Sequence, residues 1–274
     1  MTKPQTVAIT IKTVDRGAYP PKTRNYLGET MANLYRGGVF RSPHLHSLTL
    51  VDSGSPYPAE FFRTELGDPP AVNSMMLHGR RVLLDIPGER RSLHANACRA
   101  IQLAGQKGDW AEHPADWAMV LEDDIDVCSD FLESVVSWLA DFRLPDPMMY
   151  VFGANYKNIR NLYQKGKSVW LYPCGNFYGA LCCVWSPATA MDIVEWYGPD
   201  PAYLNKDGSK IYGRGHDLML ARWGRERGLK HFLASVPCFI QHTGLESGLG
   251  NRKIQYAGWR GRGYSYLEQK GNRP

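Results

Sequence analysis

Three acidic side chains, Glu122, Asp123 and Asp124, come directly after an apolar run from Trp117 to Leu121. The run is typical of a buried strand, so the three carboxylates stand at a strand end. Adjacent carboxylates repel one another, and their burial is costly unless a cation balances their charge. Carboxylates suit a hard divalent metal such as Mg²⁺ or Mn²⁺, which makes a metal site one interpretation. The other is a solvated acidic loop that caps the next helix.

The first half of the chain alternates strand and helix patterns that could position this site. We expect a strand over Thr6–Thr13, a helix over Arg24–Tyr35 and a strand over Leu45–Val51. This order begins a parallel, right-handed βαβ unit. A strand over Arg80–Asp85 and a helix over Arg91–Gln106 are expected before the acidic strand.

The second half has shorter and less regular patterns. The expected elements are a helix over Phe131–Phe142 with an Asp130/Glu133 capping pair, strands over Met148–Gly153, Ser168–Tyr172 and Phe177–Trp185, a helix from Ser186 and Pro187 to Gly198, a helix over Leu218–Arg227, and strands over Lys230–Val236 and Cys238–Gln241. Together the patterns predict one α/β domain with a mostly parallel central sheet flanked by helices. Residues 1–127 and the less regular residues 128–274, which end in a basic tail, would form its two halves.

Polar residues follow the first two predicted strands, at the sheet edge where ligands bind in open parallel sheets. Thr13, Asp15 and Arg16 follow the first strand, and Asp52 follows the second. The sequence has no G-x-G-x-x-G and no G-x-x-x-x-G-K-[ST] motif, so dinucleotide and P-loop sites lose their main support. We therefore expect a nucleotide fold that handles a diphosphate through a metal held by carboxylates.

Composition narrows the class of protein. The net charge of +5 is a mild basic excess that suits a polyanionic or phosphate-bearing partner. Nowhere do 18 apolar residues run together, so no membrane span is expected, and a cytoplasmic location is the expectation. The six cysteines form no C-x-x-C pair, which leaves zinc without support. We expect them reduced and mostly buried, with one disulfide as the alternative.

Two segments resemble a known family. Leu121-Glu122-Asp123-Asp124-Ile125 is similar to the L-E-D-D-[IV] form of N-acetylglucosaminyltransferase IV-like enzymes, which are glycosyltransferases of the GT-A fold. Pro237–Leu249 resembles that family's segment with F-x-Q-H-x-G-x-x-S-x-L. Similar small enzymes occur in bacteria and phages. The resemblance covers roughly residues 90 to 255 and implies a single GT-A-like, Rossmann-like domain that uses a nucleotide sugar, with a UDP-sugar favoured. It also implies that residues 1–127 form a nucleotide-binding half and residues 128–274 an acceptor-binding half.

The resemblance also implies a metal site for Mn²⁺ or Mg²⁺. Asp124 would be the first ligand and His242 the second, while Glu122 or Asp123 would reach the ribose or a bound water. Helix capping by Asp124 and a structural role for His242 are the alternatives.

Asp217 is the candidate general base. It lies in Gly213-Arg214-Gly215-His216-Asp217, directly before a predicted helix. In inverting enzymes of the resembled fold, a carboxylate at this place takes the proton from the acceptor hydroxyl, so an inverting mechanism is expected. Capping of the helix is the alternative role, because Asp is a favoured N-cap. His216 is a lesser candidate for the base.

The remaining site residues are expected to bind the donor. Thr13, Asp15, Arg16 and Asp52 would hold the base and ribose, Asn96 and Arg99 would face the donor from one helix, and Gly179, within residues 175–180, would line the sugar pocket. Each is also an ordinary loop, helix or strand residue.

The molecule that would accept the sugar is the feature of the reaction that the sequence determines least. A hydroxymethylated base in phage DNA is favoured, because basic residues concentrate after position 209 and cations alternate with aromatics in the tail. The tail residues are Arg252, Lys253, Tyr256, Trp259, Arg260, Arg262 and Tyr264. A lipopolysaccharide or other surface glycan is the rival acceptor. A non-catalytic glycan- or DNA-binding protein and a metal-dependent phosphohydrolase are alternatives of other classes.

Overall fold

The computed structural model describes residues 4–13, 26–55, 58, 61–62, 74–89, 91–106, 113–153, 156–177, 179–197 and 216–242. Asp15, Arg16 and the basic tail lie outside the described residues, so the expectations for them stay predictions.

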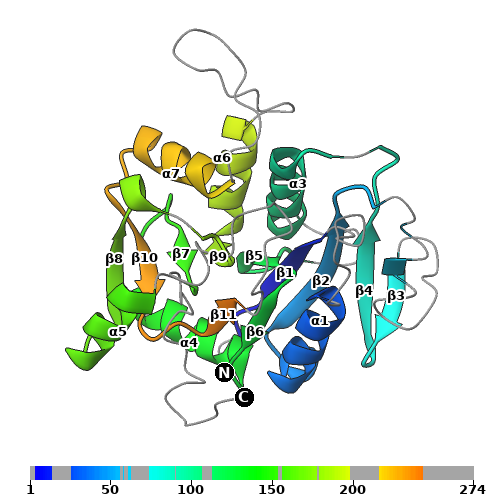
Figure 1. Cartoon of the computed structure of the whole chain (residues 1–274), viewed down its shortest axis with the longest axis horizontal. Coiled ribbons are helices and arrows are strands. Elements are labelled where there is room, and N and C mark those ends of the chain that lie inside the picture. Colours follow the sequence, from blue (N-terminus) through cyan, green and yellow to red (C-terminus); the bar gives the residue numbers. More distant parts are fainter. Residues whose placement is uncertain are drawn as a thin grey trace, which may run out of the picture.

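Nine strands form one sheet in the order β3-β4-β2-β1-β5-β9-β7-β10-β8 (Figure 1). Their bounds are β1 Val7–Thr13, β2 Leu45–Asp52, β3 Ser74–Leu77, β4 Arg80–Asp85, β5 Trp117–Glu122, β7 Tyr150–Val151, β8 Val169–Pro173, β9 Cys182–Trp185 and β10 His231–Ser235. A separate antiparallel pair joins β6, Ile125–Val127, to β11, Ile240–His242.

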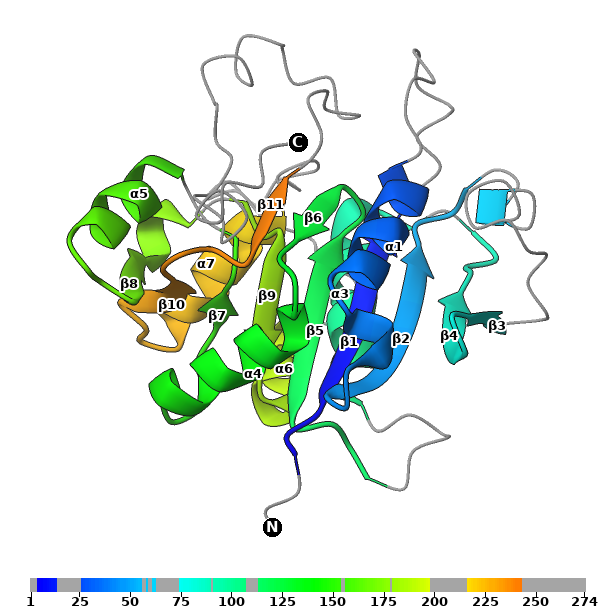
Figure 2. The ribbon, with the colours of Figure 1, turned by 90° about the horizontal axis from the view of Figure 1, so that it is seen from below.

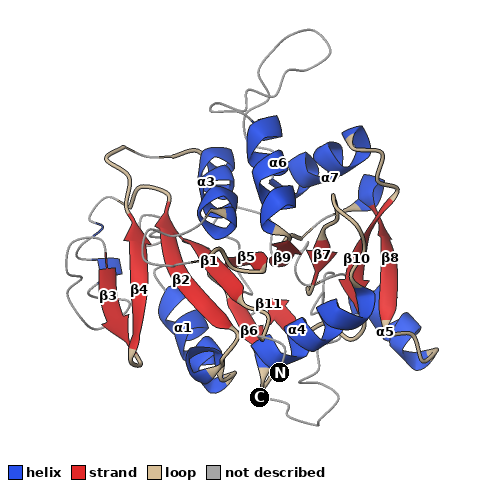
Figure 3. Ribbon diagram, turned by 180° about the vertical axis from the view of Figure 1, so that it is seen from behind, coloured by secondary structure: helices blue, strands red, loops and turns tan. Residues whose placement is uncertain are grey.

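Six α-helices are described, together with two 3₁₀ helices at Val39–Arg41 and Cys174–Asn176. The α-helices are α1 Tyr26–Arg36, α3 Leu93–Gly105, α4 Phe131–Phe142, α5 Tyr156–Gln164, α6 Pro187–Tyr197 and α7 His216–Glu226. Helices α3, α6 and α7 lie on one side of the sheet, and α1 and α4 lie on the other (Figures 1 and 3). The α/β class expected from the sequence is confirmed.

The sheet has a parallel part and a mixed part. Strands β4, β2, β1 and β5 are mutually parallel, as expected for a βαβ arrangement. Strand β9 runs antiparallel to both β5 and β7, and β8 runs antiparallel to β10. The carboxyl ends of β1, β2 and β5 therefore meet at one edge of the sheet, and the polar strand ends lie along that edge.

The side chains of β1 point alternately to the two faces of the sheet and contact the helices that cover each face. Val7, Ile9 and Ile11 are fully buried in the core that includes residues of α1 and α4. Thr10 points to the other face, where its hydroxyl donates to the carbonyl oxygen of Ala100 in α3 at 2.9 Å. Successive side chains of a strand point to opposite faces, so one short segment anchors two helical layers.

Two local expectations are wrong. Asp130 does not cap α4 through its side chain, because its backbone is left-handed, with φ 54°, and its carboxylate makes no capping hydrogen bond. The expected strand over Phe177–Trp185 is much shorter: a 3₁₀ helix occupies Cys174–Asn176, and β9 begins only at Cys182. Gly179, with φ 86°, lies between them in a conformation that a strand does not contain.

The expectations for cysteines and membrane spans can also be checked. All six cysteines are free thiols, and five of them are buried. Within the described part of the chain, no helix is long and apolar enough to cross a membrane.

Candidate functional site

The acidic triplet at the end of β5 is buried. Asp123 and Asp124 are only 3% and 5% exposed, and Glu122 is partly buried. The interpretation as a solvated acidic loop is therefore wrong. Buried carboxylates need compensating partners, and each of the three has a different one.

Strand β1 supplies the partners of the first two carboxylates. Lys12 pairs in register with Glu122 across the parallel ladder, and its Nζ lies 2.7 Å from Glu122 Oε1. Thr13, the next residue, donates its hydroxyl to Asp123 Oδ2 at 3.0 Å. Because β1 and β5 are parallel neighbours, their carboxyl ends place these two pairs side by side.

His242 contacts the third carboxylate, that of Asp124. Strands β6 and β11 pair antiparallel (Figure 2). Their register sets His242 opposite Ile125, the residue after Asp124. His242 Nε2 then lies 3.0 Å from Asp124 Oδ2. The long-range pairing of two three-residue strands thus joins the two sequence motifs that carry the family resemblance.

Helix α1 holds the turn between β5 and β6. The Thr30 hydroxyl donates to the Asp123 carbonyl oxygen at 2.9 Å and accepts from the Ile125 N–H at 3.0 Å. The Asn33 side chain donates to the Ile125 carbonyl oxygen at 2.9 Å. Both side chains are buried, so the direction in which the triplet points is fixed by packing.

Asp124 and His242 fit a divalent metal as a two-residue ligand set. A carboxylate oxygen and an imidazole nitrogen 3.0 Å apart can bind one ion together, and both donor types are found on Mn²⁺. No group of three or more His, Cys, Asp or Glu side chains among the described residues is arranged to hold a metal. An ion at this place would therefore need further ligands from water or from a bound diphosphate.

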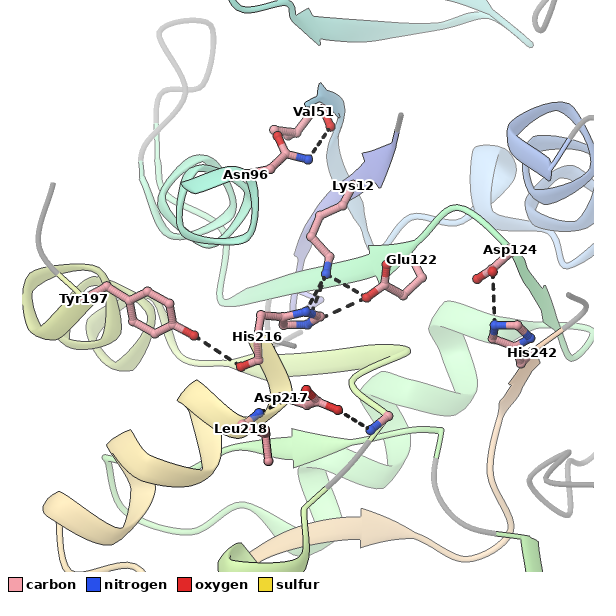
Figure 4. A network of polar contacts seen from close by, with 11 residues as sticks. Lys12, Val51, Asn96, Glu122, Asp124, Tyr197, His216, Asp217, Leu218 and His242 are labelled. Carbon is pink, nitrogen blue, oxygen red and sulfur yellow. Dashed lines mark hydrogen bonds and ion pairs between the residues drawn. The ribbon is translucent and has the colours of Figure 1, made fainter. Parts of the chain in front are cut away.

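A second cluster joins the triplet to α7. Lys12 Nζ lies 3.1 Å from His216 Nδ1 and 3.0 Å from Nε2, and His216 Nε2 lies 3.7 Å from Glu122 Oε1 (Figure 4). Burial and the Lys12 ammonium lower the pKa of His216 to about 4, so the ring is neutral at neutral pH. Burial raises the pKa of Glu122, but Lys12 outweighs this effect and holds the pKa below its usual range.

Asp217 lies in the first turn of α7, not before the helix as expected, because the helix begins at His216. Its Oδ2 accepts from the Gly179 N–H and its Oδ1 from the Leu218 N–H, both at 3.0 Å. Asp217 is 8% exposed, and these two donors fix the orientation of its carboxylate. The structure thus brings together two predicted site residues, Asp217 and Gly179.

Asp52 and Asn96 lie near each other at the carboxyl end of β2. The Asp52 carboxylate is used by its own turn, accepting from the N–H of Gly54 and from both the N–H and hydroxyl of Ser55. Asn96 donates to the Val51 carbonyl oxygen at 3.2 Å, while its buried Oδ1 has no hydrogen-bond partner in the described structure. Asn96 therefore has a buried acceptor that no described donor satisfies, whereas Asp52 already has donors.

Arg99 lies further from the acidic triplet along the sheet. Its guanidinium binds Asp85 at the end of β4 through Nη2 and Nε, at 2.9 and 3.1 Å from Oδ1. Arg91 binds the other oxygen of the same carboxylate. The two ion pairs tie α3 and the segment before it to the end of β4, and the donor-binding role expected of Arg99 stays a prediction.

Lys12 and its contact with His216 were not expected from the sequence as site features. One pattern could have revealed Lys12: in Thr6–Thr13 it is the single charged residue of a β-branched run, and it falls next to the strand end. Buried lysines are rare unless they are paired, so such a lysine predicts a buried anion nearby.

No family model and no curated protein matches the sequence. The structure is similar to two solved glycosyltransferases. GalNAc-T7, solved with UDP, GalNAc and Mn²⁺, matches 90% of this chain with a TM-score of 0.53 and 13% identity. TarS residues 1–349 from S. aureus, solved with UDP-GlcNAc, matches 90% with a TM-score of 0.52 and 9% identity.

The match spans only part of those proteins. The chain corresponds to 45% of the GalNAc-T7 structure and 61% of the TarS structure. At such low identity the likeness concerns the fold. The chain has the fold of the GT-A glycosyltransferases.

Proposed function

We propose that the protein is a metal-dependent, inverting glycosyltransferase that moves a sugar from a UDP-sugar to an acceptor hydroxyl. One observation carries the proposal. In a GT-A fold, the buried triplet at the end of β5 meets His242 on one side and, through Lys12 and His216, the Asp217-bearing helix on the other. A donor side and a candidate base thus lie at one edge of the sheet.

The donor side would be built around Asp124 and His242. A divalent ion bound by these two residues would neutralise the charge that develops on the departing diphosphate. Mn²⁺ and UDP are present in the GalNAc-T7 structure, and UDP-GlcNAc in the TarS structure, which supports this choice of ligands. The unpaired Oδ1 of Asn96 would suit the imide N–H of uracil, because that group is a hydrogen-bond donor.

The chemical step follows from the position of Asp217. Its carboxylate would accept the proton of the acceptor hydroxyl while that oxygen attacks the anomeric carbon. The bond from the anomeric carbon to the diphosphate oxygen breaks, and the diphosphate leaves with the bonding electrons. The Gly179 and Leu218 N–H groups hold the carboxylate in one orientation, which favours a positioned base over a freely rotating one.

We further propose a 5-hydroxymethylated pyrimidine in DNA as the acceptor. The basic residues after position 209 support it, since they would contact phosphates. A surface glycan or lipopolysaccharide is the rival, and the same experiment separates the two.

The test is a mass-spectrometric screen. The protein, Mn²⁺ and each of several UDP-sugars are incubated with DNA containing 5-hydroxymethylcytosine or 5-hydroxymethyluracil, with unmodified DNA of the same sequence, and with simple glycans. A hexose or N-acetylhexosamine mass added only to hydroxymethylated DNA is the expected result. Addition to a glycan alone would replace the acceptor, and UDP-sugar binding without any transfer in the whole panel would favour a non-catalytic binding protein.

A further inference from the structure

Lys12 lies between the acidic triplet and α7, and the proposed reaction gives it no role. We propose that Lys12 is a positioning residue: its ammonium holds the first turn of α7, and with it the Asp217 carboxylate, in place beside the donor site. The catalytic consequence rests on the proposed function, whereas the structural part does not.

The burial of Lys12 is the first argument. The residue is 8% exposed, and an ammonium at that depth loses hydration that its neighbours must replace. Glu122 alone would balance the charge at 2.7 Å. The ammonium nevertheless also lies against His216, a neutral side chain that adds no charge compensation, so the contact with α7 needs a different explanation.

The geometry of the contact supplies that explanation. An ammonium group has three N–H donors, whereas a neutral imidazole offers one nitrogen lone pair. Nζ lies 3.1 and 3.0 Å from the two ring nitrogens of His216, so the ammonium lies against the imidazole ring and not in line with a single lone pair, while one of its N–H groups donates to Glu122. A single side chain of β1 thereby joins β5 to α7.

Besides the longer contact of His216 with Glu122, at 3.7 Å, two hydrogen bonds hold the same turn, and both come from other parts of the fold. The Tyr197 hydroxyl of α6 donates to the His216 carbonyl oxygen at 3.3 Å, and the Gly179 N–H binds Asp217. Of the contacts of Lys12, Tyr197 and Gly179 with this turn, only that of Lys12 comes from the strand that also binds the acidic triplet. Loss of Lys12 would leave α7 attached to α6 and to the segment before β9, while toward the acidic triplet the longer contact of His216 Nε2 with Glu122 Oε1, at 3.7 Å, would remain.

Amide hydrogen exchange of the ligand-free protein tests the structural part. Lys12→Met removes the ammonium and keeps a long side chain, and Lys165→Met at an exposed position is the control. In the Lys12 variant, peptides covering the first turn of α7 should exchange at least about tenfold faster, while peptides of α1 keep their rates. Equal exchange of the α7 peptides in the wild-type protein and both variants would overturn the proposal.

Kinetics test the catalytic part. With the substrate pair that the mass-spectrometric screen identifies, Lys12→Met should lower kcat at least about tenfold, since small displacements of a catalytic group are costly, and change UDP binding in the presence of Mn²⁺ by less than about threefold. Unchanged kcat beside an active wild-type enzyme would overturn the positioning role alone. If the wild-type protein transfers no sugar, the proposed function fails, and the exchange experiment still decides the role of Lys12.

A second variant covers the case in which Lys12→Met does not fold. His216→Gln keeps the buried ammonium with Glu122 but changes its contact with α7, and the same α7 peptides should exchange faster. Where both variants fold, the double variant should be no worse than either single one, because both changes break one contact. Additive effects on exchange would show that Lys12 acts by another route.

Discussion

His242 Nε2 lies 3.0 Å from Asp124 Oδ2, although the two residues belong to motifs far apart in the sequence. Neither motif alone makes a site. The contact exists because β11 pairs with β6, directly after the turn that α1 holds. Metal and donor binding should therefore depend on both residues.

Asp124→Ala and His242→Ala should each remove the metal dependence of UDP binding. We expect the affinity for UDP with Mn²⁺ to fall by more than about 100-fold in the Asp124 variant, because loss of a second-shell partner alone often costs 10–100-fold. Isothermal calorimetry with and without Mn²⁺ measures this. Asp141→Ala, at an exposed position of α4, is the control. Wild-type affinity in the Asp124 variant would contradict the metal assignment.

Asp217→Asn should leave UDP binding unchanged and reduce transfer by about 10²–10⁴-fold, the usual contribution of a general base. The amide keeps the shape of the carboxylate and can still accept from Gly179 through its oxygen. Single-turnover transfer and calorimetry on the same preparation separate the two effects, with Asp141→Asn as the matched control. Full transfer by Asp217→Asn would assign the base elsewhere.

Gly179→Ala should both destabilise the protein and slow transfer. Gly179 has φ 86°, where a side chain costs about 1–2 kcal/mol, and its N–H orients Asp217. Urea unfolding and transfer assays measure the two consequences. Gly175→Ala is the control, because a Cβ there meets no atom within 4 Å and the backbone is not left-handed. Equal stability of the two variants would argue against the strained turn.

The stability of the ligand-free protein should fall as the pH is lowered from about 6.5 to about 4. The folded protein keeps His216 neutral down to pH about 4, whereas the unfolded chain protonates it near its ordinary pKa. Between these values the unfolded state binds more protons, so the free energy of unfolding decreases by at most about 1.4 kcal/mol per pH unit from this residue.

Urea unfolding across this pH range tests the effect. His216→Gln should have a flatter pH profile than the wild-type protein, and His113→Gln, at an exposed histidine, should keep the wild-type profile. Identical profiles for all three proteins would show that the environment of His216 does not depress its pKa.

Local patterns predicted much of the fold. The strand over Arg80–Asp85 and the helix over Phe131–Phe142 match β4 and α4 residue for residue. The helix is marked by its amphipathic spacing, a signal that acts over a few positions, whereas the strand is a short run with a weaker pattern. The choice of Asp124 and His242 as candidate metal ligands came from the family resemblance, and the structure brings these two residues together.

The rest depends on contacts between distant segments. Strand β6 has three residues, too few for a periodic pattern, and no strand is expected there from the sequence. For β11 the pattern predicts Cys238–Gln241, whereas the strand spans Ile240–His242, where it pairs with β6. In the sequence Lys12 is only a charged residue near the end of a predicted strand. Its burial results from contacts with Glu122 of β5 and His216 of α7, which lie far away in the sequence. The strand expected over Phe177–Trp185 is interrupted at Gly179, whose backbone is left-handed. Glycine can adopt this conformation but also fits a strand, so its presence in the sequence does not predict the interruption.

Lys12 and His216 are separated by 204 positions, so one comes from the first strand and the other from the last helix described. During synthesis β1 and the acidic triplet leave the ribosome long before α7 does. A nascent chain therefore carries three neighbouring carboxylates before His216 and His242 are available. Complete assembly of the site must wait for nearly the whole described chain, and early domain-like folding of the first half would not produce an active intermediate.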